Sequence, residues 1–320
     1  MIYQVSQNPD IATDRVASTK LMQKADFQKA IDQLVPEPRT VISVQRVAGG
    51  CISDAFQLEI TTPTGSKERW FLKTNKKEFY RQFLCELDGL SAIKETSTLA
   101  VPQVIASGIT HEHAWLVLDW IEQTSKSSKF FLRLGQQLAE MHRCKQGDQY
   151  GWRADNYLGS SLQKNTQTDS WPDFVAEHRI EFQLKMAHDH LQLPSDLERM
   201  IQSIISRMSD LLNGSEKKIS LLHGDLWSGN YLSNANGSRV LIDPAVYHGN
   251  REAEFGMILL FGSCPPAFYD AYQENYPLTE GWQRRCKIHT LYHLLNHLNL
   301  FGLSYLDDCR RICHQILGSK

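Results

Sequence analysis

The chain has 320 residues, of which 42% are hydrophobic and 22% charged, a composition typical of a folded globular protein. Its net charge of −2 argues against a nucleic-acid-binding surface, and no apolar run is long enough to span a membrane. Seven irregularly spaced cysteines and a start without a basic-then-apolar leader argue against a secreted disulfide framework and favour a cytoplasmic location.

The first part of the chain has the alternation of β-strands. Residues 39–47, 55–61 and 68–74 are rich in β-branched and aromatic residues, and turn sequences separate them. In the third segment Lys73 lies on the opposite face from Leu72. Three short strands joined by turns predict an antiparallel sheet.

The pattern then changes to that of a helix over residues 76–95, where apolar side chains recur every three or four positions. After Pro102, the segments VPQVIASG and HAWLVLDWI predict two more strands.

Helical periodicity dominates from about residue 125. Residues 127–142, 195–212 and 279–301 are amphipathic, and Ser128 is a candidate cap for the first of these helices. The polar stretch 124–129 is a candidate junction. The sequence therefore predicts an α+β fold of two lobes, a sheet-rich lobe over residues 1–122 and a mainly helical lobe over residues 123–320, with a cleft between them.

Two stretches in the second lobe concentrate polar groups. LLHGDLWSGNY (221–231) places Asp225 and Asn230 five residues apart, and Asp243 follows in VLIDPAVYHG. The intervening SNANGS (233–238) predicts a hairpin turn that brings Asn230 beside Asp243. One amide oxygen and one carboxylate suit Mg²⁺, which keeps waters and substrate phosphates as its other ligands. Asp225 is then the candidate base.

Candidate groups for binding phosphate lie in the first lobe. VAGGCISDAF (47–56) has a Gly pair between two strands, where backbone N–H groups can approach a phosphate, although Gly-Gly is also a common hairpin turn. Lys73 can pair with Glu86 of the following helix, or both can be exposed. No Gly-Lys-Ser/Thr sequence follows the Gly pair, so a Walker-type loop is disfavoured.

HGDLWSGN with a downstream DPA resembles the kinase-like fold of small-molecule phosphotransferases, the relatives of aminoglycoside and choline kinases. Over residues 40–305 the chain is more narrowly similar to the fructosamine/ketosamine-3-kinase family. The further stretches that carry this resemblance are GGCISDAF, FLKTN, FLCELDGL, DPAVYHGNREAE, LYHLLNHLNLFG and residues 150–184.

The resemblance implies a two-lobed protein-kinase-like fold and an ATP- and Mg²⁺-dependent kinase. Asp225 would be the catalytic base, and Asn230 and Asp243 would hold Mg²⁺. The residues that it assigns to ATP are Gly49, Gly50, Cys51, Ile52, Ser53, Lys73, Glu86, Trp120, Ile121 and Glu122. The family phosphorylates the 3-hydroxyl of ketosamines, free or protein-bound, and the unstable product decomposes to release the amine, which implies deglycation repair.

The resemblance is incomplete after DPAVY. The family commonly has GDREAD there, whereas this chain has Asn250 in place of the first Asp and Glu254 in place of the second. If the second acid braces the catalytic loop, the added methylene changes the geometry of that brace.

Candidates for contact with the acceptor are Trp227, which can stack on a sugar adduct or pack in the core, and three residues of the middle segment. These three are Asn156, Trp171 and Arg179.

For the remaining motifs, we prefer a structural role to a functional site. His289, His293 and His297 share a helix face, and without a convergent acid they favour packing over zinc binding. His223 is expected to brace its loop. Cys309 and Cys313 are expected to be small residues of a helix.

Cys51 is a different case, because a thiol in a phosphate loop can be acidified and oxidised, or can simply fit the turn.

Two rival functions also stay open: a phosphotransferase for another alcohol, such as an aminoglycoside or choline, and an inactive nucleotide-binding module. The mixed charges of residues 145–185 weigh against a polycationic aminoglycoside.

Overall fold

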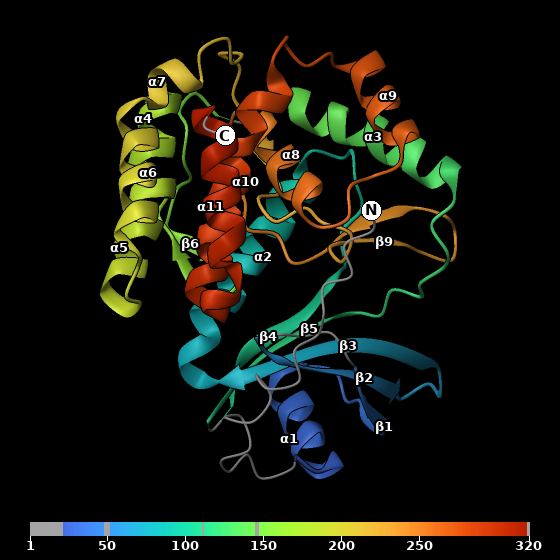
Figure 1. Cartoon of the computed structure of the whole chain (residues 1–320). Coiled ribbons are helices and arrows are strands. Elements are labelled where there is room, and N and C mark those ends of the chain that lie inside the picture. Colours follow the sequence, from blue (N-terminus) through green and yellow to red (C-terminus); the bar gives the residue numbers. More distant parts are fainter. Residues whose placement is uncertain (1–21, 48–51, 111, 145–146, 319–320) are drawn as a thin grey trace. The chain divides into compact units, whose positions relative to one another are not determined.

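The computed structural model describes residues 22–47, 52–110, 112–144 and 147–318. The chain divides into two compact units, the first formed by residues up to Phe83 with Gln103–Trp120, and the second by Leu84–Pro102 with the residues from Ile121 onward (Figure 1). Residues 84–102 thus join the second unit, whereas a boundary at residue 122 places them in the first lobe. The division at residue 122 stays a prediction.

The first unit contains a five-stranded antiparallel sheet in the order β1-β2-β3-β5-β4. The strands are β1 (Thr40–Arg46), β2 (Asp54–Thr61), β3 (Lys67–Lys76), β4 (Val104–Thr110) and β5 (His113–Asp119). Each corresponds to a strand predicted from the sequence. Buried and less buried residues alternate in β3, whereas residues 114–118 of β5 are all buried.

Helix α1 (Lys24–Leu34) covers one face of this sheet, and the sequence analysis had missed it. Its Phe27 ring lies 4.8 Å from that of Phe56 and 5.9 Å from that of Trp115. Phe27, Ala30 and Ile31 are its buried residues, at the spacing of one helix face. They join the side chains of the sheet in a separate hydrophobic core.

Helix α2 (Tyr80–Glu95) follows a 3₁₀ turn at Lys77–Phe79, so the predicted helix 76–95 begins later than its periodicity suggested. Beyond Phe83 the helix belongs to the second unit. There Gly89 packs against Pro244 so closely that a Cβ atom would lie 2.9 Å from the proline ring.

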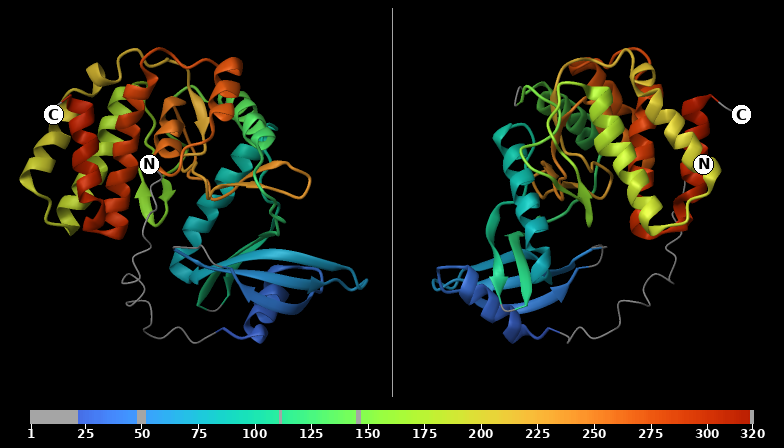
Figure 2. Two further views of the ribbon diagram at one scale, coloured as in Figure 1. Left: turned by 45° about the vertical axis from the view of Figure 1, so that its right-hand side comes forward. Right: turned by 90° about the vertical axis from the view of Figure 1, so that its left-hand side faces the viewer.

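The second unit is mainly helical. Its helices are α3 (Ser128–Arg143), α4 (Trp171–Val175), α5 (Phe182–His190), α6 (Ser195–Ser206), α7 (Met208–Leu211), α8 (Glu252–Leu260), α9 (Pro266–Asn275), α10 (Trp282–Phe301) and α11 (Leu306–Leu317). Helices α5, α6, α10 and α11 pack side by side (Figure 2). A buried ion pair between Arg285 and Glu252, 2.6 Å long, ties α10 to α8.

Two details correct the sequence analysis. Ser127, not Ser128, caps α3, and its hydroxyl accepts a hydrogen bond from the Phe130 amide at 3.3 Å. The helix expected over residues 195–212 is interrupted at Arg207, where α6 ends and α7 begins.

Short antiparallel strand pairs complete the second unit. They are β6 (Asn156–Leu158) with β7 (Ser161–Gln163), β8 (Ser220–Leu222) with β11 (Tyr247–Gly249), and β9 (Tyr231–Ser233) with β10 (Arg239–Leu241). Within the described ranges, no helix has the length and apolar character needed to cross a membrane.

Candidate active site

Two strand pairs bring together the polar loops that the sequence singled out. The first loop, residues 223–230, connects β8 to β9, and the second loop, residues 242–246, connects β10 to β11. The Ile242 amide donates to the Asn230 carbonyl at 3.0 Å, and the Ala245 amide donates to the His223 carbonyl at 2.9 Å. The loops therefore lie side by side. The turn expected at residues 233–238 forms the β9–β10 hairpin, closed by the Asn234 amide, which donates to the Ser238 carbonyl at 3.1 Å.

Asp225 and Asn230 are in direct contact within the first loop. The Asn230 Nδ2 donates to the Asp225 Oδ2 at 3.0 Å and to the Asp225 carbonyl at 2.8 Å. Burial, with a smaller contribution from the nearby charge of Asp243, raises the pKa of Asp225 to about 7, against the lowering effect of the Asn230 hydrogen bond. Without a bound metal, Asp225 is thus an acid whose charge changes near neutral pH, a property that suits a general base.

His223 braces the two loops, as the sequence analysis expected. Its Nε2 donates to the Ile242 carbonyl at 2.9 Å, and its Nδ1 accepts from the Asp225 amide at 3.3 Å. Burial lowers the pKa of His223, which keeps the ring neutral, with the proton on Nε2 that these two bonds require. The ring is committed to backbone groups and has a structural role.

Glu254, at the start of α8, holds the same loop from the other side. Its Oε2 accepts from the His223 amide at 2.6 Å and its Oε1 from the Gly224 amide at 3.1 Å. Gly224 has a φ of +81°, and a Cβ atom there would lie 2.1 Å from the Ala245 carbonyl oxygen. A side chain at position 224 would therefore push the two loops apart.

The donor set of the loops fits a magnesium ion. Because the Asn230 Nδ2 is bonded to Asp225, the Asn230 Oδ1 is the amide atom that can bind a metal, and Asp243 supplies an exposed carboxylate. Within the described ranges, neither the two loops nor any other place has a group of three or more His, Cys, Asp or Glu side chains placed to hold a metal, so the loops offer one amide oxygen and carboxylates. An ion bound here would take its remaining ligands from water and phosphate.

Of the residues assigned to ATP, Gly49, Gly50 and Cys51 lie outside the described residues. Ile52 and Ser53, which precede β2, are both held by one side chain. The Nδ2 of Asn75 donates to the Ile52 carbonyl at 3.0 Å and to the Ser53 hydroxyl at 3.1 Å. Asn75 was not among the predicted residues, although its place two residues after Lys73, on the same face of β3, could have indicated it.

The other residues assigned to ATP belong to both units. Lys73 is half-buried on β3 opposite Ala55, and Glu86 is half-buried on α2 in the second unit. At the end of the first unit, Trp120 lies 6.4 Å from the ring of Phe71, and its amide donates to the Arg69 carbonyl. The Lys73–Glu86 pair and the contact of Trp120 with adenine stay predictions.

Ile121 and Glu122 begin the second unit, and Glu122 is exposed. Their contact with adenine likewise stays a prediction.

Trp227 is half-buried between Asp225 and Asn230 in the first loop. Its ring covers Gly229, where a Cβ atom would lie 2.5 Å from the indole, and it approaches the ring of Phe261 at 6.1 Å. The placement beside the candidate base agrees with a wall for the acceptor, which stays a prediction.

Asn156, Trp171 and Arg179 are buried in the interior of the second unit, with 4%, 4% and 2% of their surfaces exposed. Trp171 stacks on Phe174, and the Arg179 guanidinium lies 4.2 Å from the ring centre of Tyr247. This burial favours a structural role over direct contact with an acceptor, and their assignment to the acceptor site stays a prediction.

The histidines of α10 pack in the interior. His289 and His293 are 4% and 3% exposed, and the ring of His297 lies 4.8 Å from that of Phe261. Burial lowers the pKa of His289 to about 3, so its ring is neutral. Cys309 and Cys313 are buried and free on α11.

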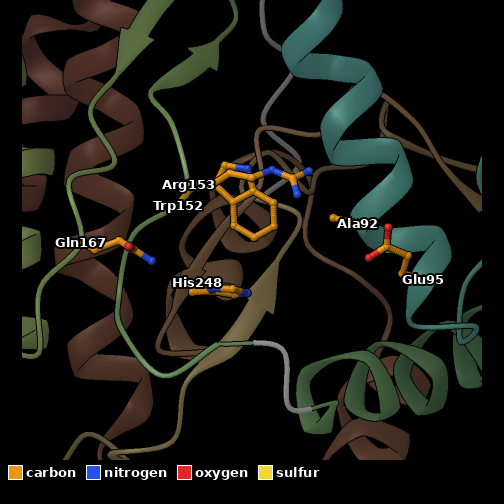
Figure 3. A pocket seen from close by; sticks show the side chains of 6 residues that line it. All are labelled: Ala92, Glu95, Trp152, Arg153, Gln167 and His248. Carbon is orange, nitrogen blue, oxygen red and sulfur yellow. The ribbon is translucent and has the colours of Figure 1, made fainter.

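A cavity of about 310 Å³ lies elsewhere in the second unit, between α2 and β11 (Figure 3). Trp152 and His248 line it, and the Nε2 of His248 has no hydrogen-bond partner there. Asp225, Asn230 and Asp243 are not among its lining residues, so the cavity is separate from the two loops.

Comparison with known proteins decides the family. The model of the fructosamine kinase family, described as "Fructosamine kinase", matches residues 23–319. This chain belongs to the fructosamine kinase family. The family and the kinase-like fold expected from HGDLWSGN and DPAVY are therefore confirmed.

Relatives within the family align over most of their length. A probable ketoamine kinase of Synechocystis sp. is 35% identical over 288 residues, covering 90% of this chain and 94% of the relative. A chloroplastic protein-ribulosamine 3-kinase of Arabidopsis thaliana is 35% identical over 279 residues, covering 87% of this chain and 83% of the relative.

Solved structures share the fold. A fructosamine-3-kinase candidate from Haemophilus somnus 129PT superposes with a TM-score of 0.80 at 26% identity, covering 91% of this chain and 96% of the other. An aminoglycoside phosphotransferase APH(4)-Ia, solved with AMP-PNP and hygromycin B, has a TM-score of 0.58 at 14% identity over 91% of this chain and 96% of its own. At that identity the second likeness concerns the fold alone.

The contacts of Glu254 and Asn250 show what the two departures from the family's GDREAD sequence change. Glu254 still places its carboxylate on the first loop, through the two amide bonds described above. Asn250 is buried and uses its amide locally, because its Nδ2 donates to the Glu216 carbonyl at 2.7 Å and its Oδ1 accepts from the Glu252 amide at 2.9 Å. Neither departure therefore takes a contacting polar group away from the first loop.

Proposed function

We propose that this fructosamine kinase family member transfers the γ-phosphoryl group of ATP, with Mg²⁺, to the 3-hydroxyl of a ketosamine. The observation that carries the proposal is the pairing of the two loops. It places Asp225, with a pKa of about 7, against Asn230 and near Asp243. A base, an amide oxygen and a second carboxylate are the parts that phosphoryl transfer to an alcohol needs at one site.

Asp225 has the geometry of a base that orients a hydroxyl. Its Oδ2 is held by Asn230, so the Oδ1 can accept the hydrogen of an acceptor alcohol. As the alcohol oxygen bonds to the γ-phosphorus and the bond to the leaving phosphate oxygen breaks, the hydroxyl proton passes to Asp225. Asn230 and Asp243 would hold Mg²⁺, which when bound neutralises phosphate charge.

ATP binding is assigned to the segment from Gly49 to Ser53, to Lys73 with Glu86, and to Trp120–Glu122. Support comes from the kinase family and from the AMP-PNP bound by a structure of the same fold. The bracing of Ile52 and Ser53 by Asn75 suits a loop that must present its backbone to phosphate.

The acceptor is proposed to be a ribulosamine- or fructosamine-type adduct, either free or on a protein. A protein-ribulosamine 3-kinase among the relatives supports the former type. Trp227, beside the base, offers an aromatic face for the sugar portion. Decomposition of the 3-phosphorylated adduct would release the amine, so the cellular role would be deglycation repair, in the cytoplasm.

The proposal is tested by ³¹P NMR of ATP with Mg²⁺ and the erythrulosamine, ribulosamine and fructosamine adducts of lysine. We expect transfer to at least one adduct, and Asp225→Ala should abolish turnover while calorimetry still detects nucleotide. A near wild-type rate in Asp225→Asn would show that the base is wrongly assigned.

Two further arms address the rival functions. Kanamycin or choline as a better acceptor than every ketosamine would favour another phosphotransferase. Binding of ATP without transfer to any of these acceptors would favour an inactive nucleotide-binding module.

A further inference from the structure

Asp243 occupies an unusual backbone conformation. Its φ is +55°, in the left-handed region that non-glycine residues seldom adopt. Such a conformation costs free energy and persists only where the surroundings impose it. The second loop must therefore be held by contacts outside itself.

Side chains hold the carbonyl groups on both sides of Asp243. His223 binds the Ile242 carbonyl, as described above. On the other side, the Nε2 of Gln163 donates to the Ala245 carbonyl at 3.0 Å, and the Nδ2 of Asn156 donates to the Val246 carbonyl at 2.7 Å. Both amides come from the β6–β7 hairpin, about eighty to ninety residues away in sequence.

A buried network fixes these two amides in one orientation. The Gln163 Nε2 also donates to the Asn156 Oδ1 at 2.8 Å, and the Gln163 Oε1 accepts from the Tyr292 hydroxyl at 2.8 Å. Asn165 donates to the same Asn156 Oδ1 at 2.8 Å and accepts from the Arg179 Nη2 at 2.8 Å.

None of these side chains is exposed by more than 4%. Buried amides with their donors and acceptors occupied cannot turn without leaving a polar group unpaired, which is costly.

We infer that Gln163 and Asn156 are positioning residues, which set the second loop so that the Asp243 carboxylate meets the Asn230 amide oxygen at one metal ion. This inference rests on the proposed function, and it gives Asn156 and Arg179 a role that their burial allows. Residues that orient metal ligands commonly change metal affinity or activity by about 10–100-fold when they are replaced.

The test compares two buried glutamines of the second unit. Gln163→Met keeps a side chain of similar length but removes the donor to the second loop. Gln183→Met is the matched control, because Gln183 is also 1% exposed, and its side-chain amide donates to Asn296 at 3.2 Å and accepts from Asn299 at 2.7 Å, not from the two loops.

The first measurement is amide hydrogen exchange in the protein without metal or nucleotide. We expect peptides that cover residues 240–247 to exchange about tenfold faster in Gln163→Met and at the wild-type rate in Gln183→Met. Equal exchange of these peptides in the two variants, or an acceleration spread evenly over the second unit, would overturn the inference. This readout holds even if no ketosamine is phosphorylated, so its failure is distinct from failure of the proposed function.

The second measurement is the affinity for Mn²⁺ with AMP-PNP, by electron paramagnetic resonance, and the rate at saturating ATP. In Gln163→Met the dissociation constant of Mn²⁺ should rise about tenfold and kcat should fall, with a change of less than about twofold in the ketosamine KM. Unchanged Mn²⁺ affinity would overturn the inference. If Gln163→Met does not fold, Asn156→Leu, which removes the donor to Val246, decides by the same two measurements.

Discussion

Asp225 sits where its charged form is disfavoured, because burial and the charge of Asp243 raise its pKa to about 7 from an ordinary value of 3.8. Between these values the folded protein holds a proton that the unfolded chain has released. The free energy of unfolding therefore falls as the pH rises through this window, and the loss is complete above pH 7.

Asp225→Asn should consequently stabilise the metal-free protein while abolishing turnover. At pH 8 in the presence of a chelator we expect the Tm to rise by about 2 °C or more, with a smaller gain at pH 5. Calorimetry at the two pH values checks this, with Asp307→Asn on the exposed end of α11 as control. A gain of the same size at both pH values would contradict the assigned pKa.

At the scale of single residues, the sequence grouped the candidate reacting residues but did not reveal the residues that support them. Asp225, Asn230 and Asp243 could be grouped because two glycines and a hairpin turn lie between them in the chain. Gln163 could not, because its partner Ala245 is 82 residues away and the contact is to a backbone carbonyl. Because every residue type has a backbone carbonyl, a side chain that binds one has no partner that can be recognised by its residue type.

At the scale of elements, the candidate active site depends on how closely two strand pairs bring their loops together. Gly224→Ala places a methyl group 2.1 Å from the Ala245 carbonyl oxygen, so the loops must separate. We expect kcat to fall about 100-fold, as a displacement of about 1 Å can cause, with an unchanged circular dichroism spectrum.

Gly237→Ala is the matched control for this prediction. Gly237 has a φ of +72°, close to the +81° of Gly224, but no other atom lies within 4 Å of the added methyl. Its cost should be limited to about 1 kcal/mol of backbone strain, with kcat unchanged. Equal loss of activity in both variants would mean that strain, and not separation of the loops, is responsible.

Element types followed from periodicity, and element ends did not. The strands of the first unit were predicted from their β-branched, aromatic and apolar segments, and helices α3 and α10 from the helical periodicity of their apolar residues. The break at Arg207 has no glycine or proline to announce it. Helix α1 was missed although Phe27, Ala30 and Ile31 have helical spacing, because only these three residues mark its buried face.

At the scale of the whole molecule, the residues that the structure describes form two hydrophobic cores, one in each unit. Phe27→Ala removes a ring from the first core, where 1% of the native side chain is exposed, at a cost of about 3–5 kcal/mol. Hydrogen exchange should accelerate in peptides of β1, β2 and β3, with little change in α10 and α11.

Phe255→Ala serves as the reciprocal variant, because Phe255 is fully buried in the second core. It should accelerate exchange in α8 and α10 and leave the first sheet protected. Acceleration in both units from either variant would show that the two cores unfold as one.

The α+β class was predictable because most of the strand alternation lies before residue 122 and most of the helical periodicity after it. Helix α2 also lies before residue 122, and its pattern indicates a helix but not the unit with which it packs. Gly89 settles that question only through its contact with Pro244, which no local pattern reveals.

The position of Trp227 also gives the protein a built-in optical reporter. Of the seven tryptophans, Trp70, Trp115 and Trp171 are at most 4% exposed and should emit at short wavelength whatever is bound. Trp227, half-exposed beside Asp225, should emit further to the red and change when an acceptor covers it. The difference spectrum between the native chain and Trp227→Phe would then follow acceptor binding without a label.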